Sequence, residues 1–315
     1  MEKSEIYDVL IIGGGPAGAA ACVYAARKRL HAALVADTFG GQSSVSEKIY
    51  NWIGTAEISG QKLADDLKAH VKAYEGEYLK IHEGFRATLL ERKGDIFETT
   101  IEKDGAKSVI TSRSVLISSG SQRRRLEVPG ADKLEHRGLT YCASCDGPLF
   151  ADQDVAVIGG GNAAFETAAQ LLAYCKSVTM LHRSSDFRAD EITVEKVLAN
   201  PKMKAFKNIE VMEVTGAKFV EGIVYKDKHE GMATTLPVSG IFVEIGQLPN
   251  TDFVKDLLPL DEIGRITIDP TTGRAQLPGI WAAGDCTNVL YHQNNIAAGD
   301  AVRAIEDLYL YLHKR

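Results

Sequence analysis

The pair Cys142 and Cys145, followed directly by Asp146-Gly147, is the part of the sequence best suited to redox chemistry. Two cysteines at this spacing can act as a redox dithiol, and a thiolate is the species that attacks another disulfide. A zinc site is the alternative for such a pair. It is disfavoured here because the sequence has neither a second pair nor histidines at ligand spacing.

A first glycine-rich loop, residues 13–18, lies between a predicted buried strand over residues 7–12 and an alanine-rich helix over residues 17–27. Such a turn needs glycines for the bend, for close approach of a pyrophosphate and for packing of the helix on the strand. A further strand over residues 33–36 is followed by Asp37, where a carboxylate would meet a ribose hydroxyl. The alternative is a glycine-rich turn in an ordinary α/β domain. The candidate contacts are Gly13, Gly15, Pro16, Ala17, Gly18 and Asp37.

A second glycine-rich loop, residues 159–164, repeats this pattern between a predicted strand over residues 154–158 and a helix over residues 163–174. The next strand, residues 178–181, ends in arginines where an acid would mark an unphosphorylated ribose. Arginine can hold a 2′-phosphate, so this loop predicts NADPH. Alternatively, the arginines are solvated surface charges, and the intervening Asp186 weakens their field. The candidate contacts are Gly159, Gly161, Asn162, Ala163, His182, Arg183 and Arg188.

Length and charge set the frame for these motifs. A chain of 315 residues with loops 146 residues apart predicts two α/β domains, and a net charge of −6 argues against a nucleic-acid partner. The sequence has no run of about twenty apolar residues, and residues 1–5 lead directly into the first strand without room for a signal peptide. We therefore expect a soluble cytoplasmic protein with no membrane partner.

Further strands and one helix complete the predicted organisation. Residues 114–120 and 278–285 each read as a buried strand running into a turn, and Asp285 would face a ligand at the carboxyl end of its strand. Residues 84–110 alternate short β-rich runs with charged turns, which indicates an antiparallel hairpin or meander. Leu63 to Tyr74 carry the apolar stripe of an amphipathic helix, which we interpret as packing.

The other cysteines are interpreted as packing residues. Cys22 lies within the helix after the first loop, and Cys175 lies at the end of the helix after the second. Cys286 follows Gly284-Asp285 near a predicted helix start, where its thiol pKa could be lowered. It has no partner cysteine within three residues, so we expect no catalytic role for it.

From about Tyr7 to the carboxyl terminus the chain resembles the low-molecular-weight thioredoxin reductases, which are class II pyridine nucleotide-disulfide oxidoreductases. The motifs that carry this resemblance are the two glycine loops, Gly40-Gly41-Gln42, Asn51-Trp52-Ile53-Gly54, the Cys-x-x-Cys-Asp-Gly element, His182-Arg183, Gly246 with Pro249-Asn250-Thr251, and Ala283-Gly284-Asp285 with Gln293. Residues 145–150 and 240–246 are locally more similar to the flavoprotein subunit of alkyl hydroperoxide reductase.

The resemblance implies two Rossmann-like, three-layer domains. The NADPH-binding domain, residues 123–247, carries the dithiol and is inserted into the FAD-binding domain, residues 1–122 and 248–315. FAD would lie at the first loop, with Asp37, Gly41, Gln42, Asn51, Gly284, Asp285 and Gln293 around it, and NADPH at the second, with Gly246 nearby. The resemblance also implies a homodimer and a rotation of one domain against the other.

The mechanism implied is electron transfer from NADPH through FAD to the Cys142–Cys145 disulfide by way of Cys145, followed by attack of Cys142 on a disulfide of a thioredoxin-like or glutaredoxin-like carrier. A thiolate that leaves needs a proton, and Asp146 is the candidate acid. An ordinary aspartate, with a pKa near ~3.9, would be ionised, so burial must raise this pKa. The alternative for Asp146 is a helix N-cap or turn residue before Gly147.

Some positions depart from the family pattern, and other functions stay open. Ser184 replaces a second arginine common after His-Arg, Asn294-Asn295 replace apolar residues, and Ala275 replaces a frequent threonine. Arg123 to Arg125 could steer an acidic partner or form a solvated cluster. The alternative functions are electron donation to a peroxiredoxin or glutaredoxin-like partner, a ferredoxin-linked flavin disulfide reductase and a non-catalytic flavin-binding protein.

Overall fold

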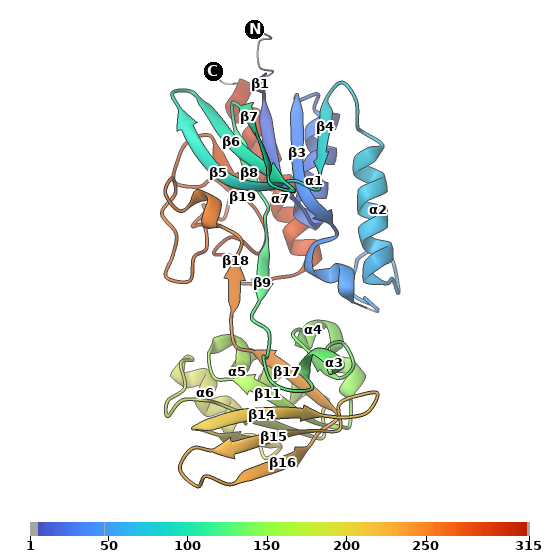
Figure 1. Ribbon diagram of the computed structural model, residues 1–315, viewed down its shortest axis with the longest axis vertical. Helices are drawn as coiled ribbons and strands as arrows, with labels where there is room; N and C mark the ends of the chain where they lie inside the picture. The colour runs from blue at the N-terminus through green and yellow to red at the C-terminus, as the bar shows by residue number, and fades with distance from the viewer. Residues whose placement is uncertain (1–5, 47, 314–315) are drawn as a thin grey trace. The chain divides into compact units, whose positions relative to one another are not determined.

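The computed structural model describes residues 6–46 and 48–313, so the amino-terminal segment that the signal-peptide argument concerns lies outside the described residues. The chain divides into two compact units, Met1–Gln122 with Leu248–Arg315, and Arg123–Gln247 (Figure 1). We call them unit 1 and unit 2. Which nucleotide each unit binds stays a prediction.

Unit 1 is built on a parallel sheet of strand order β19-β8-β2-β3-β4. Strands β2, β8 and β19 are short apolar runs, as expected for strands buried on both faces, whereas the edge strand β4 is mostly polar. Their bounds are β2 Val9–Gly14, β3 Ala32–Phe39, β4 Leu79–Glu83, β8 Val115–Ile117 and β19 Ile280–Ala282. The helices of this unit are α1 Pro16–Arg27, α2 Gly60–Lys72 and α7 Asn294–His313, with short 3₁₀ turns η1 Gly41–Val45 and η3 Asp252–Val254.

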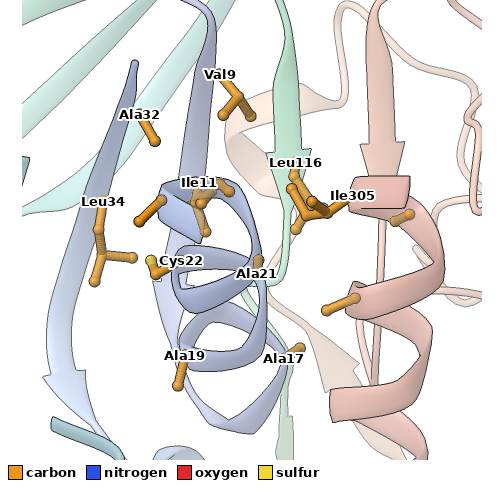
Figure 2. Packing of buried hydrophobic residues seen from close by; sticks show 14 of the residues in the cluster. Val9, Ile11, Ala17, Ala19, Ala21, Cys22, Ala32, Leu34, Leu116 and Ile305 are labelled. Atoms are coloured by element: carbon orange, nitrogen blue, oxygen red, sulfur yellow. The ribbon is translucent and has the colours of Figure 1, made fainter. Parts of the chain in front are cut away.

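Alternate residues of β2 serve two separate cores. Val9 and Ile11 pack with the α1 and α7 side, where Leu116 and Ile305 join them (Figure 2). Leu10 and Ile12 pack in the other core, against a sheet of order β1-β7-β6-β5 in which β5, β6 and β7 are antiparallel and β1 joins β7 in parallel. The bounds of that sheet are β1 Ile6–Tyr7, β5 Arg86–Lys93, β6 Ile96–Lys103 and β7 Ala106–Ser112. Because strand side chains alternate with period two, the central sheet carries a layer on each face.

Unit 2 repeats this plan. Its parallel sheet has the order β10-β17-β11-β12-β13, and an antiparallel sheet of order β14-β15-β16 covers one face. The parallel strands are β10 Leu139–Thr140, β11 Asp154–Gly159, β12 Ser177–Leu181, β13 Met203–Phe206 and β17 Gly240–Glu244. The antiparallel strands are β14 Ile209–Thr215, β15 Gly222–Asp227 and β16 Ala233–Pro237. The helices are α3 Ala131–Leu134, α4 Ala143–Asp146, α5 Asn162–Leu171 and α6 Glu191–Leu198, with the 3₁₀ turn η2 Gly147–Phe150.

The strand β11 of unit 2 also alternates between two cores. Val155 and Val157 pack with α5, while Ala156 and Ile158 pack towards the antiparallel sheet. The two crossing segments of the chain, β9 Ser121–Arg123 and β18 Gln247–Pro249, pair with each other as strands. The predicted α/β fold with two Rossmann-like, three-layer domains is confirmed.

Two further predictions about elements can be compared with the structure. The antiparallel meander predicted within residues 84–110 is present as β5, β6 and β7. The helix start predicted near Cys286 is wrong, because residues 283–293 form turns and loops and α7 begins only at Asn294. Across the described residues, every helix is too short or too polar to cross a bilayer.

We expect Gly18→Ala to destabilise unit 1. A Cβ at Gly18 would lie 1.8 Å from the carbonyl oxygen of Gly13, a backbone atom that cannot move aside. Overpacking of this kind costs about 1–3 kcal/mol, which corresponds to a fall in Tm of about 2–4 °C for each kcal/mol. Gly299→Ala is the matched control, because a Cβ there meets no atom within 4 Å and helical alanine is favoured over glycine. A Gly18→Ala protein that melts at the wild-type temperature would show that α1 can move away from β2.

Candidate active site

The predicted dithiol is a disulfide at the start of helix α4. Cys142 and Cys145 are bonded, with their Cα atoms 5.3 Å apart. Cys142 is the N-cap residue of α4, and the backbone N–H of Cys145 donates to the Cys142 sulfur at 3.2 Å. Neither cysteine is fully buried, whereas Ala143 between them is. A hydrogen bond to sulfur favours the thiolate, so the reduced pair can supply a nucleophile at Cys142.

Asp146 lies where burial shifts its pKa in the direction that an acid role needs. Burial, the largest influence, raises the pKa of its carboxyl above the ordinary aspartate value, while the Thr140 hydroxyl and nearby His136 act in the opposite direction. The Thr140 hydroxyl donates to the Asp146 carboxylate and accepts from the backbone N–H of Cys142 at 3.4 Å. The Asp146 side chain forms no capping bond to the turn η2 that follows it. Its carboxyl is therefore directed to Thr140 and not to helix capping.

The dithiol, the second glycine loop and the partly buried acid Glu244 meet at one edge of the unit 2 sheet. Strands β10, β17 and β11 are parallel neighbours, so their carboxyl ends share that edge. β10 leads into Cys142, β11 into the glycine loop, and β17 ends at Glu244. Open α/β sheets bind ligands outside the carboxyl ends of their strands.

Glu244 is a functional candidate that the sequence argument missed. Its carboxyl accepts from the Thr167 hydroxyl at 2.9 Å and lies 3.4 Å from the Arg123 guanidinium. Burial raises its pKa, against the lowering influence of Arg123 and Thr167. The sequence could have indicated Glu244, because it is an acidic residue within the apolar run of residues 240–245. Thr140, two residues before Cys142, was missed as well.

The glycine loops leave the space that a pyrophosphate needs. At Gly13 and Gly159 a Cβ would collide with backbone carbonyls, at 2.2 Å and 2.3 Å, so the fold itself demands glycine there. At Gly15 and Gly161, by contrast, a Cβ would meet only ordinary contacts, at 3.8 Å and 3.7 Å. The protein's own packing does not explain these two glycines. Close approach of a ligand to the first turns of α1 and α5 does, so the loops fit two dinucleotides.

The residues around the second loop have distinct roles. The ring of His182 is buried beneath Gly160, and its Nε2 lies 2.9 Å from the Asp186 carbonyl oxygen. His182 thus supports the loop, and its contact with a cofactor stays a prediction. The Asn162 side chain accepts from the Asp190 N–H at 2.8 Å, which ties α5 to the start of α6.

The arginines at the tip of β12 are exposed, and one of them is tied to the glycine loop. The backbone N–H of Arg188 donates to the Gly160 carbonyl at 2.7 Å, so the segment after β12 returns to the loop. The Arg183 side chain is exposed at the strand tip. Asp186 lies between them in the chain and accepts from Ser185 at 2.7 Å. Arg188 thus lies beside the second loop and Arg183 at the tip of β12, and their reading of a 2′-phosphate stays a prediction.

In unit 1 the structure brings distant predicted residues together in pairs. The Gln42 amide donates to the Asp285 carboxylate at 3.2 Å, and the Asn51 amide donates to Gln293 at 3.1 Å. Asp37 is paired with a residue that was not predicted for the site. The Nε and Nη2 nitrogens of Arg86 donate to its carboxylate at 2.8 Å and 2.6 Å. A ribose hydroxyl would have to share Asp37 with this exposed ion pair, which is worth only about 0–1 kcal/mol.

The remaining candidates lie at turns or at the start of a helix. Pro16 and Ala17 open α1 and are buried, and Ala163 is exposed in the first turn of α5. Gly41, Gly246 and Gly284 have positive φ angles of 62°, 112° and 73°, which glycine adopts most readily.

The other cysteines have raised, not lowered, thiol pKa values. Burial raises the pKa of Cys286 and of Cys175 to about 11 each, and raises that of Cys22 as well. The lowered pKa considered for Cys286 is therefore wrong, since the helix start that would have caused it is absent and the thiol is fully buried. Within the described residues, no group of three or more histidine, cysteine or acidic side chains is placed to hold a metal ion.

We expect Asp146→Asn to stabilise unit 2 at neutral pH. A carboxyl whose pKa is raised by folding binds its proton more tightly in the folded chain, so the free energy of unfolding falls as pH rises through the raised pKa. Asparagine carries no charge, so the variant does not lose this free energy of unfolding at neutral pH. Its gain in stability over the wild-type protein should shrink towards about pH 4, near the ordinary aspartate pKa. Thermal melts over this pH range measure it.

Asp154→Asn is the control of opposite sign. Lys176 and Ser177 lower the pKa of this carboxyl, so its substitution should reduce stability at neutral pH. A destabilised Asp146→Asn protein at neutral pH would mean that the contacts of the carboxylate outweigh the cost of burying its charge.

Comparison with known proteins agrees with this geometry. The profile of the family described as pyridine nucleotide-disulphide oxidoreductase matches residues 7–301. The chain is 40% identical to an NADH dehydrogenase of Ferdinandcohnia aciditolerans, over 97% of this chain and 57% of that protein. It is 38% identical to an alkyl hydroperoxide reductase subunit of Staphylococcus aureus, over 99% of this chain and 60% of that protein.

A solved structure gives the same result for the fold. The thioredoxin reductase of Streptococcus pyogenes is 33% identical, with a TM-score of 0.89, covering 99% of this chain and 100% of that one. The chain spans 57–60% of the length of the curated relatives named above. It belongs to the pyridine nucleotide-disulphide oxidoreductases, a family of oxidoreductases whose membership implies FAD and a nicotinamide nucleotide as cofactors.

Proposed function

We propose that this protein is a thioredoxin reductase-like enzyme that passes electrons from NADPH, through FAD and the Cys142–Cys145 disulfide, to a disulfide of a small carrier protein. The observation that carries the proposal is the disulfide next to a carboxyl of raised pKa. A disulfide with a neighbouring proton donor is what reversible thiol exchange requires. A homodimer and the assignment of FAD to unit 1 and NADPH to unit 2 belong to the same proposal.

Bound FAD and nicotinamide supply the hydride chemistry that amino acid side chains lack. The residues of the chain do the rest. The disulfide takes up two electrons and two protons and becomes two thiols, with Asp146 protonating the sulfur of Cys145 as the S–S bond breaks. Cys142, as thiolate, then attacks the carrier disulfide to form a mixed disulfide. Cys145 attacks Cys142, which releases the carrier as a dithiol and restores the Cys142–Cys145 bond.

The glycine loops determine where the cofactors are held. Gly15 and Gly161 leave the first turns of α1 and α5 open to a pyrophosphate. The Gln42–Asp285 and Asn51–Gln293 pairs supply donors and acceptors for the polyol and ring of a flavin. The exposed Arg183 and Arg188 support NADPH over NADH, because a charged hydrogen bond to a 2′-phosphate has no counterpart in NADH.

A second candidate is electron donation to a peroxiredoxin or a glutaredoxin-like protein in peroxide reduction. The relatives described as subunits of alkyl hydroperoxide reductase favour it. Turnover with thioredoxin-like, glutaredoxin-like and peroxiredoxin carriers, measured side by side, separates the two candidates. Stopped-flow reduction by NADPH, compared with reduced ferredoxin, tests the ferredoxin-linked alternative.

Cys142→Ser and Cys145→Ser should each abolish carrier reduction while leaving reduction of the bound flavin by nicotinamide intact, because the hydride step precedes the dithiol. The measurements are stopped-flow absorbance of the flavin and steady-state carrier turnover. Ser144→Ala, between the two cysteines and exposed, is the matched control and should keep full activity. Cys145→Ser leaves Cys142 free to trap the carrier as a mixed disulfide, which identifies it. Purified protein that neither contains nor takes up FAD would refute the proposed function.

Arg183→Ala and Arg188→Ala should each lower kcat/KM with NADPH by roughly ten- to a hundredfold, because a charged hydrogen bond contributes about 1.5–3 kcal/mol. With NADH the same changes should matter little. Arg137→Ala, an exposed arginine elsewhere in unit 2, controls for the change in net charge. Equal losses with both coenzymes would show that Arg183 and Arg188 serve the fold and do not read the phosphate.

A further inference from the structure

The tip of β12 lacks the second arginine of the family pattern, since Ser184 occupies that position. The neighbouring strand β13 ends at the same edge of the sheet, with Leu181 of β12 paired to Phe206 of β13. The next residue after β13 is Lys207. Because parallel strands present their carboxyl ends together, Lys207 emerges at the same edge of the sheet as Arg183 and Ser184.

Backbone hydrogen bonds continue this pairing beyond the strand ends. The N–H of Asn208 donates to the Ser184 carbonyl at 3.2 Å, and the N–H of Ile209 donates to the His182 carbonyl at 2.9 Å. The ammonium group of Lys228 donates to the Arg183 carbonyl at 2.8 Å. The segment that carries Lys207 is therefore held against the segment that carries Ser184.

The Lys207 side chain is directed towards the segment that joins the strand tip to the glycine loop. Its ammonium lies 4.6 Å from the centre of the Phe187 ring. Phe187 precedes Arg188, whose backbone binds Gly160. Lys207 is exposed, and the salt bridges found within residues 6–46 and 48–313 do not include its ammonium. This cation is thus held by an aromatic ring and remains available to an anion.

We propose that Lys207 is a third cation, with Arg183 and Arg188, that reads the 2′-phosphate of NADPH in place of the missing arginine at position 184. The inference rests on the proposed function, since it presumes that unit 2 binds the nicotinamide nucleotide. Lysine binds phosphate as a point charge. A specificity residue on β13 would not be found by reading the tip of β12 alone.

Calorimetric titration of the purified holoprotein with NADP⁺, NAD⁺, 2′,5′-ADP and 5′-AMP tests this assignment. We expect Lys207→Gln to weaken NADP⁺ and 2′,5′-ADP by about tenfold, the smaller end of a charged hydrogen bond, and to leave NAD⁺ and 5′-AMP unchanged. Lys207→Arg should retain most of the NADP⁺ affinity. Lys204→Gln, which removes an exposed charge from the same strand, is the matched control and should have no effect.

Three results overturn the assignment. Equal weakening of NADP⁺ and NAD⁺ by Lys207→Gln would show that the lysine supports the Phe187 segment and does not read the phosphate. Unchanged affinities, with the wild-type protein preferring NADP⁺, would refute the role of Lys207 and leave the proposed function standing. Binding of neither nucleotide by the wild-type protein would refute both.

Discussion

Close contact between a strand and the helix that follows it is the constraint on which both units depend. In unit 1 the first turn of α1 lies so near β2 that Gly18 has no room for a methyl group beside the Gly13 carbonyl. In unit 2 the corresponding residue is Ala164, whose methyl is buried at the start of α5. Each contact fixes the open end of its helix at the carboxyl edge of a parallel sheet. The space that Gly15 and Gly161 leave is useful only because the helix ends are held there.

The same edge of unit 2 positions the redox chemistry. The short strand β10 adds its carboxyl end to those of β17 and β11, so the chain that leaves it carries Cys142 to the edge where the glycine loop begins. Thr140, the last residue of β10, connects the strand to the chemistry because its hydroxyl binds Asp146. Burial of this carboxyl favours its neutral form, and the hydroxyl favours the charged form. In the proposed mechanism, the neutral form of this carboxyl is the proton donor to the disulfide.

The features that could be predicted from the sequence are those that depend on a local pattern of residue types. The strand, glycine turn and helix of each loop follow from residue types in register, as do the dithiol and the antiparallel meander. Contacts between distant segments were beyond that reasoning, because no local pattern pairs Gln42 with Asp285, Asp37 with Arg86, or Glu244 with Arg123. His182 shows a related limit. A histidine at a strand tip suggests a ligand contact, but only the folded chain shows its ring filling the space under Gly160.

Charge at the tip of β12 shows why a motif read along one strand can mislead. The family pattern would lead one to read Ser184 as a weakened NADPH site, since one arginine is missing from the chain segment. A phosphate, however, responds to the charges around it in space and not to their order in the sequence. The carboxyl end of β13 adjoins that of β12, and Lys207 and Lys228 both lie on segments that hydrogen-bond to residues 182–184 or their neighbours. Under the role proposed for Lys207, coenzyme preference would depend on two adjacent strand ends, and substitutions on either would change it while the glycine loop stays the same.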